Sequence, residues 1–307
     1  MRSIFARLDD KSGQIGVFRG PEGLAVAQIR ASAAASKPTL AYCEFESDQD
    51  SDTLPKLARR LPNRKLPATT VLPSDAYHLL LVEAPQVPDD ELLGAVRWRI
   101  KDLIDYHIDD AVIDVFQMPS QSRGGPDQMM YAVVAKASDV RSEVTAAEAA
   151  GLNLDAIEII ELSLRNIAAR LEEDARGVAF LYLAESSGVL LLVRQGVLYL
   201  TRHIETGVDV LRQADGLRSE LVAGLALETR RSLDYFESHY EQQAIPVLHT
   251  AGLDPTDQDQ MARELGISVR NVDLAALVES ATDLDEHAQR RCLPAIGAAL
   301  RQDTVKL

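Results

Sequence analysis

The chain has 307 residues, of which 46% are hydrophobic and 26% charged, a composition typical of a globular protein with a sizeable core. Its net charge of −15 argues against a general nucleic-acid binder, because neutralising phosphates requires an excess of lysine and arginine. No apolar run approaches the ~18–20 residues that span a bilayer, and the first residues lack the apolar core of a signal peptide. Cys43 and Cys292 lie far apart and are expected to be reduced core thiols, so we expect a cytoplasmic protein.

In chain order, the first expected element is a weak meander of three short strands. These strands are expected at Ile4–Leu8, Gln14–Phe18 and Leu24–Arg30. The least regular segment follows at 31–68, and it contains the only concentrated positive charge: Arg59, Arg60, Arg64 and Lys65. This cluster is either the polar face of a short helix or a contact for an acidic partner or lipid headgroups. Residues 1–84 are about neutral, with 11 Lys/Arg against 10 Asp/Glu, which suits a contact region better than the acidic remainder.

A helix is expected over Asp90–Ile104, after the prolines at 85 and 88. One apolar stripe should face the core: Leu92, Leu93, Val96, Ile100, Leu103 and Ile104. Trp98 lies about 180° from the middle of this stripe at 100° per residue, beside Arg97 and Lys101. Either a second subdomain covers Trp98, or the tryptophan belongs to a partner surface, where aromatic and arginine side chains are enriched.

The rest of the chain alternates strands and helices. We expect a hairpin of 112–118 and 130–135 across the turn at 124–126, followed by helices that end at Ala150 and Glu172. A meander of three strands should come next, at Val178–Leu183, Val189–Val193 and Val197–Thr201. The elements expected after it are a long helix over Leu217–Tyr240, a strand at Ile245–Thr250, a helix over Thr256–Leu265, an edge strand at Val269–Val272, and a final helix with Pro294 in its first turn. The central meander, within Gly177–Gly207, is nearly all apolar, so both faces of its sheet should be covered.

Two meanders in one chain predict a duplicated α/β fold with two related halves and a cleft between them. We expect an N-terminal lobe over 1–160, made of a core subdomain at 1–84 and an inserted subdomain at 85–150. The C-terminal lobe should cover 161–307, with the hairpin core at 177–207 and a last helix that returns toward the first lobe.

Several stretches carry a resemblance to a known family. VPDDELLGAVRWRIKDLIDYHIDDAVIDVFQM, MYAVVAKASDVRSEVTAAEAAGLNLDAIEII, LETRRSLDYFESHY and LPAIGAALR, in this order, resemble the PilM/MshI family of actin-like proteins of type IV pilus biogenesis, MSHA-type pili included. The likeness spans nearly the whole chain. It implies the actin/hexokinase/Hsp70 type of fold, with two lobes, each built on a mixed sheet, around a nucleotide cleft.

The first hairpin of a nucleotide-binding relative would resemble GIDIGSSSxK, with an aspartate for magnesium and a lysine for phosphate. This chain has IGVFRGPEGLAVAQI instead. Phe18 stands near the acidic position, Pro21 removes a backbone donor, and Glu22 adds a charge that should repel phosphate. Val26 stands near the position of the missing lysine, and Gly20 remains as a vestigial cleft residue.

The other vestigial cleft positions are Ser186, Ser187, Gly188, Gly207 and Gly252. The second hairpin, YLAESSGVLLL, lacks the family's aspartate and is read as an ordinary turn, and HTAGLDPTD replaces the adenosine-side motif. Losing these anchors should cost several kcal/mol, since each charge-assisted contact contributes about 1.5–3 kcal/mol. We therefore expect no cofactor, with ATP and magnesium disfavoured. No catalytic residue or metal site is expected, since the six histidines lack ligand spacing.

The resemblance implies a non-enzymatic, degenerate actin-like scaffold, peripherally associated with the inner membrane. It would bind the cytoplasmic segment of a PilN-like inner-membrane protein in a groove between the first meander and the subdomain at 85–150. Arg59, Arg60, Arg64 and Trp98 are the candidate partner-binding residues. A pilus motor ATPase and a second copy of the chain are further candidate partners. Two alternatives stay open: a functional actin-like ATPase or nucleotide switch, and the cytoplasmic domain of a type II secretion component.

Overall fold

A computed structural model of the chain describes residues 12–31, 37–47, 50–119, 129–280 and 284–302. The chain folds into two compact units, and each is composed of segments that are distant in sequence. The first unit contains the residues up to Pro73 together with Glu143–Ile167 and Asp273–Gln302. The second contains Ser74–Ser142 and Ala168–Val272. No helix in the described part of the chain is both long and apolar enough to cross a lipid bilayer.

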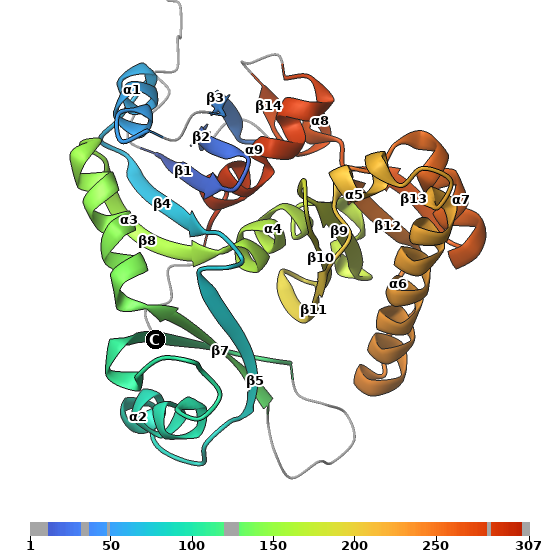
Figure 1. Cartoon of the computed structure of the whole chain (residues 1–307), viewed down its shortest axis with the longest axis horizontal. Coiled ribbons are helices and arrows are strands. Elements are labelled where there is room, and N and C mark those ends of the chain that lie inside the picture. The colour runs from blue at the N-terminus through green and yellow to red at the C-terminus, as the bar shows by residue number, and fades with distance from the viewer. Residues whose placement is uncertain (1–11, 32–36, 48–49, 120–128, 281–283, 303–307) are drawn as a thin grey trace, which may run out of the picture. The chain divides into compact units, whose positions relative to one another are not determined.

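The first unit is built on a six-stranded mixed sheet in the order β14-β3-β2-β1-β4-β8 (Figure 1). Its strands are β1 (Gly13–Gly20), β2 (Gly23–Arg30), β3 (Thr39–Glu46), β4 (Pro67–Leu72), β8 (Asn153–Ile159) and β14 (Glu279–Ser280). The strands β1, β2 and β3 form an antiparallel meander, while β4 and β8 continue the sheet in parallel pairing beyond β1.

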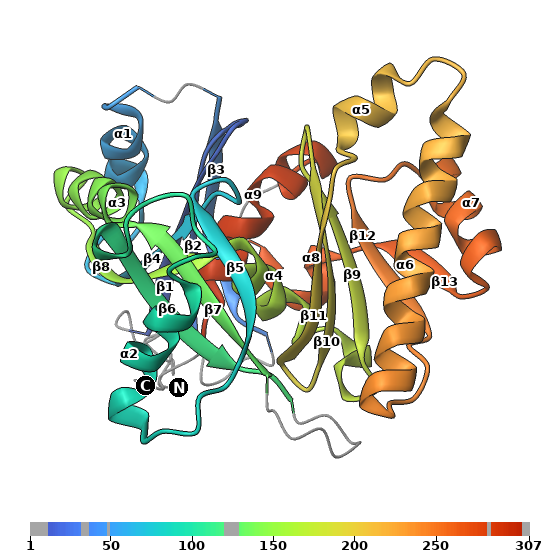
Figure 2. The same cartoon turned by 60° about the horizontal axis from the view of Figure 1, so that its bottom comes forward.

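Helices cover both faces of this sheet (Figure 2). On one face, β1 and β2 pack against α1 (Thr53–Arg60) and the end of α3 (Ala137–Ala149). On the other face lies α9 (Glu286–Ala299), and it comes so close that a Cβ on Gly16 would stand 1.8 Å from the carbonyl oxygen of Ala295. The helix α4 (Ile160–Ala168) holds α9 in turn, because the Ser163 hydroxyl donates to the Pro294 carbonyl over 2.6 Å.

The second unit contains a five-stranded sheet in the order β11-β10-β9-β12-β13. Its strands are β9 (Val178–Leu183), β10 (Gly188–Arg194), β11 (Val197–Ile204), β12 (Val247–Ala251) and β13 (Ser268–Asn271). It repeats the topology of the first sheet: an antiparallel meander β9-β10-β11, followed beyond β9 by two parallel strands. This repetition is the duplicated α/β architecture predicted from the two meanders.

One face of the second sheet packs against the long helix α6 (Arg218–Tyr240) and against α7 (Pro255–Leu265) (Figure 2). The predicted buried side of α6 is confirmed, since its marker residues are all buried: Val222, Leu225, Thr229, Leu233, Phe236 and Tyr240. A short helix, α5 (Val208–Gln213), connects β11 to α6, while α8 (Leu274–Leu277) and β14 lead back to the first unit.

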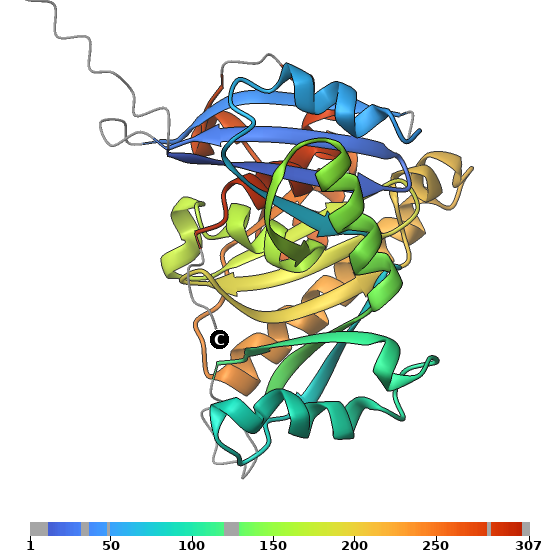
Figure 3. The same ribbon diagram turned by 90° about the vertical axis from the view of Figure 1, so that its left-hand side faces the viewer.

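A separate three-stranded antiparallel sheet, in the order β5-β7-β6, also belongs to the second unit. Its strands are β5 (Tyr77–Glu83), β6 (Ala111–Gln117) and β7 (Met129–Lys136). The helix α2 (Asp89–Ile100), teal in Figure 3, lies along one face of this sheet. Val96 and Ile100 of α2 are fully buried there against Val82, Val115 and Met130.

Several expectations about elements require correction. The third strand of the first meander is Thr39–Glu46, within the segment taken as irregular, and the expected strand Ile4–Leu8 lies outside the described residues. The helix α2 ends at Ile100 rather than Ile104, so Leu103 lies beyond it and is 58% exposed. Leu93 is 47% exposed because the sheet covers only one side of the helix. Pro294 lies inside α9 rather than in its first turn, because the helix begins eight residues earlier, at Glu286.

The boundaries of the two compact units also differ from those of the lobes expected at 1–160 and 161–307. Residues 74–142, which were expected in the N-terminal lobe, group with the second unit. The reason is a shared core, in which Met118 and Tyr131 of the small-sheet region pack with strands β9–β11 and with α6. The turn expected at 124–126 lies outside the described residues, although its two strands, β6 and β7, pair as predicted.

Candidate functional site

The turn between β1 and β2 is tied to α9 by ion pairs. The Glu22 carboxylate accepts from both terminal nitrogens of the Arg290 guanidinium, each over 3.0 Å, and from Nε of Arg291 over 3.0 Å. Arg290 is only 4% exposed, so this charge pair is withdrawn from water. The expectation that Glu22 repels phosphate therefore needs correction. The charge of Glu22 is balanced by two guanidinium groups, and its carboxylate accepts hydrogen bonds from their N–H groups.

The start of α5 packs on the turn between β9 and β10 and is hydrogen-bonded to it. The amide of Val208 donates to the Ala184 carbonyl over 2.8 Å, and the amide of Asp209 donates to the Glu185 carbonyl over 2.9 Å. Gly207 makes this approach possible, because a Cβ there would stand 2.3 Å from the Glu185 carbonyl oxygen. These first amides of α5 therefore donate to carbonyl groups of the hairpin and cannot at the same time donate to a phosphate.

Gly252 lies beside the same hairpin, between β12 and α7. Its φ of +108° favours glycine, and a Cβ would stand 2.9 Å from the Leu183 carbonyl oxygen and 3.0 Å from Val208. The structure therefore brings Ser186, Ser187, Gly188, Gly207 and Gly252 to one end of the β9–β10 hairpin. Gly20 belongs to the other unit, where a Cβ would stand 2.7 Å from the Phe18 ring.

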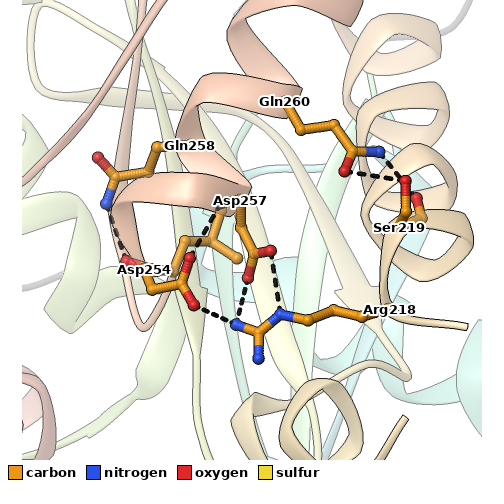
Figure 4. Close-up of polar contacts among 7 residues, drawn as sticks. Arg218, Ser219, Asp254, Asp257, Gln258 and Gln260 are labelled. Atoms are coloured by element: carbon orange, nitrogen blue, oxygen red, sulfur yellow. Dashed lines mark hydrogen bonds and ion pairs between the residues drawn. The ribbon is translucent and has the colours of Figure 1, made fainter. Parts of the chain in front are cut away.

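The residues after Gly252 form an ion-pair cluster with Arg218 at the start of α6 (Figure 4). The Arg218 guanidinium donates to both carboxylate oxygens of Asp257, over 3.1 and 2.7 Å, and also contacts Asp254. Asp254 caps α7 by accepting from the Asp257 amide over 3.0 Å. The hydrogen bond to Asp257 is the main cause that raises the pKa of Arg218, and Asp257 itself is only 3% exposed.

None of the three arginines was singled out from the sequence. Glu22 and Arg290 are 268 positions apart, and Arg218 and Asp257 are 39 apart, so no local pattern links them. The one available signal was the presence of Glu22 and Asp257 at turns where a nucleotide-binding relative would avoid negative charge. Buried carboxylates of this kind require a cation, but the sequence does not say which one.

The candidate partner-binding residues lie on the surface. Trp98 is 73% exposed on α2, and the Lys101 ammonium lies 5.0 Å from its ring centroid. One alternative from the sequence was that a second subdomain covers Trp98, but no described residue buries it. Arg59 and Arg60 end α1, and Arg64 follows in the next turn, all three exposed. Arg60 pairs with Glu44 and, at 3.7 Å, with Glu46, which leaves Arg59 and Arg64 as the less neutralised charges. Trp98 and the arginines belong to different units.

The part of the chain that the structure describes contains no group of three or more histidine, cysteine or carboxylate side chains placed to hold a metal ion. Cys43 and Cys292 are both buried and reduced. A hydrogen bond to Cys292, together with burial, raises the pKa of the Cys43 thiol well above its ordinary value, so this thiol is not a poised nucleophile.

Known structures with the same fold identify the architecture. A chain of the PilM–PilN type IV pilus biogenesis complex matches with a TM-score of 0.73 and 20% identity, covering 94% of this chain and 98% of that chain. The cytoplasmic domain of EpsL, an inner-membrane component of the type II secretion system of Vibrio cholerae, matches with a TM-score of 0.52 and 11% identity, covering 95% and 97%. No protein-family model and no curated protein matches the sequence. The predicted actin-like fold is thereby confirmed.

Proposed function

We propose that the protein is a non-enzymatic scaffold of the PilM/MshI type in a type IV, MSHA-like pilus assembly machine. In this role it binds the cytoplasmic segment of a PilN-like inner-membrane protein and is held at the inner membrane through that partner. The observation that carries the proposal is the fold shared with the PilM–PilN complex over 94% of the chain. A pilus motor ATPase and a second copy of the chain are further partners that such a scaffold would have.

The internal ion pairs support a scaffold rather than an ATPase. Each turn that would approach a nucleotide in this fold makes contacts within its own unit. Glu22 pairs with Arg290 and Arg291, and the β9–β10 turn accepts hydrogen bonds from the start of α5. Asp254 and Asp257 pair with Arg218. A triphosphate would have to displace these contacts and then meet uncompensated carboxylates. We therefore propose that the protein is a pseudo-ATPase that needs neither ATP nor magnesium.

Partner binding is proposed at two exposed features. Trp98 offers a large aromatic surface beside Arg97 and Lys101, and tryptophan and arginine are enriched among residues that dominate binding energy. Arg59, Arg60 and Arg64 offer positive charge to an acidic stretch of a partner, on a protein whose net charge is −15.

The test is capture of the cytoplasmic segment of the PilN-like protein by the purified chain. Trp98→Ala and the double variant Arg59→Glu/Arg60→Glu should each weaken capture by about thirtyfold or more, which corresponds to a loss of about 2 kcal/mol or more for a dominant contact. Leu227→Ala, at a site 49% exposed on α6, and Arg263→Glu, at an exposed site on α7, are matched controls that should bind as the wild type does. Unchanged capture by both test variants would remove these residues from the interface.

The likeness to the cytoplasmic domain of EpsL supports a second candidate, a component of a type II secretion machine. The same purified chain distinguishes the two functions when it is offered the cytoplasmic segments of PilN-like and secretion-type inner-membrane proteins from its own host. Selective capture of the secretion segment would replace the pilus assignment, while selective capture of the PilN-like segment would support it.

A further inference from the structure

A cavity of about 380 Å³ in the second unit is separate from the nucleotide turns and from the candidate partner-binding residues. Leu79 and Leu81 of β5 and Tyr131 of β7 form one wall, and the consecutive residues Tyr199–Arg202 of β11 form another. Tyr235 and Tyr240 of α6 also line it. Its size falls within the ~300–1,000 Å³ range of pockets that bind ligands.

The identity of the lining residues shows how the cavity meets each sheet. Successive side chains of a strand point to opposite faces, so a cavity over one face is lined by alternate residues. Leu79 and Leu81 follow that rule, and they face away from α2, which packs on Leu80 and Val82. Four consecutive residues of β11 line the cavity, however, so β11 borders it along the edge of the strand. The cavity and Trp98 therefore lie on opposite faces of the small sheet.

The strand β11 has a free edge at this place. It ends the five-stranded sheet and, among the described strands, pairs only with β10. Its ladder is interrupted at Tyr199, which has no partner between the pairs Val193–Leu198 and Leu192–Leu200. Such bulges turn an edge strand locally and are frequent beside binding sites. The Tyr240 hydroxyl donates to the Tyr199 carbonyl over 3.1 Å and holds this geometry.

Two polar side chains at this edge can still form a hydrogen bond or an ion pair with a ligand. Arg202 is exposed and donates through Nε to the Ser232 hydroxyl over 2.9 Å, yet it makes no ion pair with any described residue. The Thr201 hydroxyl is buried and finds no hydrogen-bond partner in the described part of the chain. Leu81 is 50% exposed at the cavity, although its neighbours on this face pack into the core. A free cation beside exposed apolar surface suits an amphipathic, negatively charged ligand.

We propose that the free edge of β11 binds an extended segment of a partner protein as an additional strand of the five-stranded sheet. Alternate apolar side chains of that segment enter the cavity against Leu79, Leu81 and Tyr131, and a carboxylate on the segment pairs with Arg202. The backbone supplies affinity by strand addition, while the cavity and Arg202 supply specificity. This site is independent of the pilus assignment, since any partner that carries such a segment would bind.

The test uses the full chain and a library of fluorescein-labelled hexapeptides in which valine, leucine or phenylalanine alternates with polar residues, one of them aspartate or glutamate. Anisotropy titrations should find members that bind with micromolar affinity. Leu81→Asp and Arg202→Glu should each weaken their binding at least tenfold. Leu227→Asp, equally exposed on α6, and Arg263→Glu, on α7, should leave it within about twofold, the scatter expected of distant surface changes.

Strand addition is separated from simple filling of the cavity by the peptide backbone. N-methylation of alternate amides removes the hydrogen bonds of one edge of the peptide, so one of the two N-methylated series should lose binding while the other retains it. Amide hydrogen exchange at Tyr199–Arg202 should slow when the unmodified peptide binds. Absence of any binding peptide, equal binding to Arg202→Glu, or equal binding of both N-methylated series would overturn the proposal.

Discussion

At the scale of single residues, the turns of this protein are stabilised by charges that pair within the chain. Arg290 is nearly buried and depends on Glu22, and Arg218 bridges two carboxylates of which Asp257 is buried. A buried ion pair is weak evidence for net stability, but removal of one partner is costly because the other is left uncompensated. These residues therefore allow direct stability tests.

We expect Glu22→Ala to lower the free energy of unfolding by about 3 kcal/mol or more, because it leaves Arg290 buried without this counterion. Urea denaturation followed by circular dichroism measures the change. Glu46→Ala, at a carboxylate 44% exposed and 3.7 Å from Arg60, is the control and should change stability by less than about 1 kcal/mol. A similar small loss for both variants would show that the contact of Glu22 with α9 contributes little.

A second residue-scale prediction concerns pH. Burial lowers the pKa of His249 from its ordinary value, despite the Glu173 carboxylate 3.2 Å away. Burial acts to raise the pKa of Glu173, but its hydrogen bonds, His249 and Arg270 together lower it. Both groups bind protons more readily when unfolded, so stability present at neutral pH should fall as the pH drops below ~6.5, the ordinary histidine pKa.

The variant His249→Gln should therefore show a shallower loss of stability between about pH 7 and 5 than the wild type. His287→Gln, in an exposed first turn of α9, is the matched control and should keep the wild-type slope. Equal slopes for wild type and His249→Gln, from urea midpoints at several pH values, would count against a depressed histidine pKa.

At the scale of elements, the most regular apolar patterns were predicted best. The strand β9 is buried along its whole length and β10 is buried up to Val193, and the long helix α6 keeps one buried stripe, so these elements agree with expectation within a few residues. The strand β3 was missed because most of its residues are only half buried and its pattern mixes apolar and polar side chains. Its place in the sheet depends on pairing with β2 and β14, which no local signal reveals.

Packing of α9 on the first sheet gives a prediction at this scale. A Cβ at Gly16 would overlap the Ala295 backbone, so Gly16→Val should displace the helix and lower the free energy of unfolding by about 3 kcal/mol. Gly94→Val on α2, where a Cβ would meet nothing within 4 Å, is the control and should cost less than about 1 kcal/mol. Equal thermal midpoints for Gly16→Val and the wild type would show that α9 does not need this close approach.

At the scale of the whole molecule, the fold class was predictable because the order of the sequence motifs along the chain matches that of the resembled family. No single motif is matched well enough to identify the fold alone. The repeated meander-plus-parallel topology and the match to the PilM–PilN complex confirm that expectation. The cleft residues were named by comparing three turns with the family's motifs, as the positions that remain where charged anchors are missing. The sequence could not show that Glu22 and Asp257 have arginine partners, since those contacts exist only after the distant segments have packed.

The proposed role is tested most directly by calorimetric titration of the full chain with the cytoplasmic segment of the PilN-like protein, with and without MgATP. We predict micromolar or tighter binding of the segment, unchanged by MgATP, and no heat of MgATP binding at micromolar concentrations. Micromolar binding of MgATP, or binding of the segment only in its presence, would instead establish a nucleotide switch and contradict a scaffold that works without nucleotide.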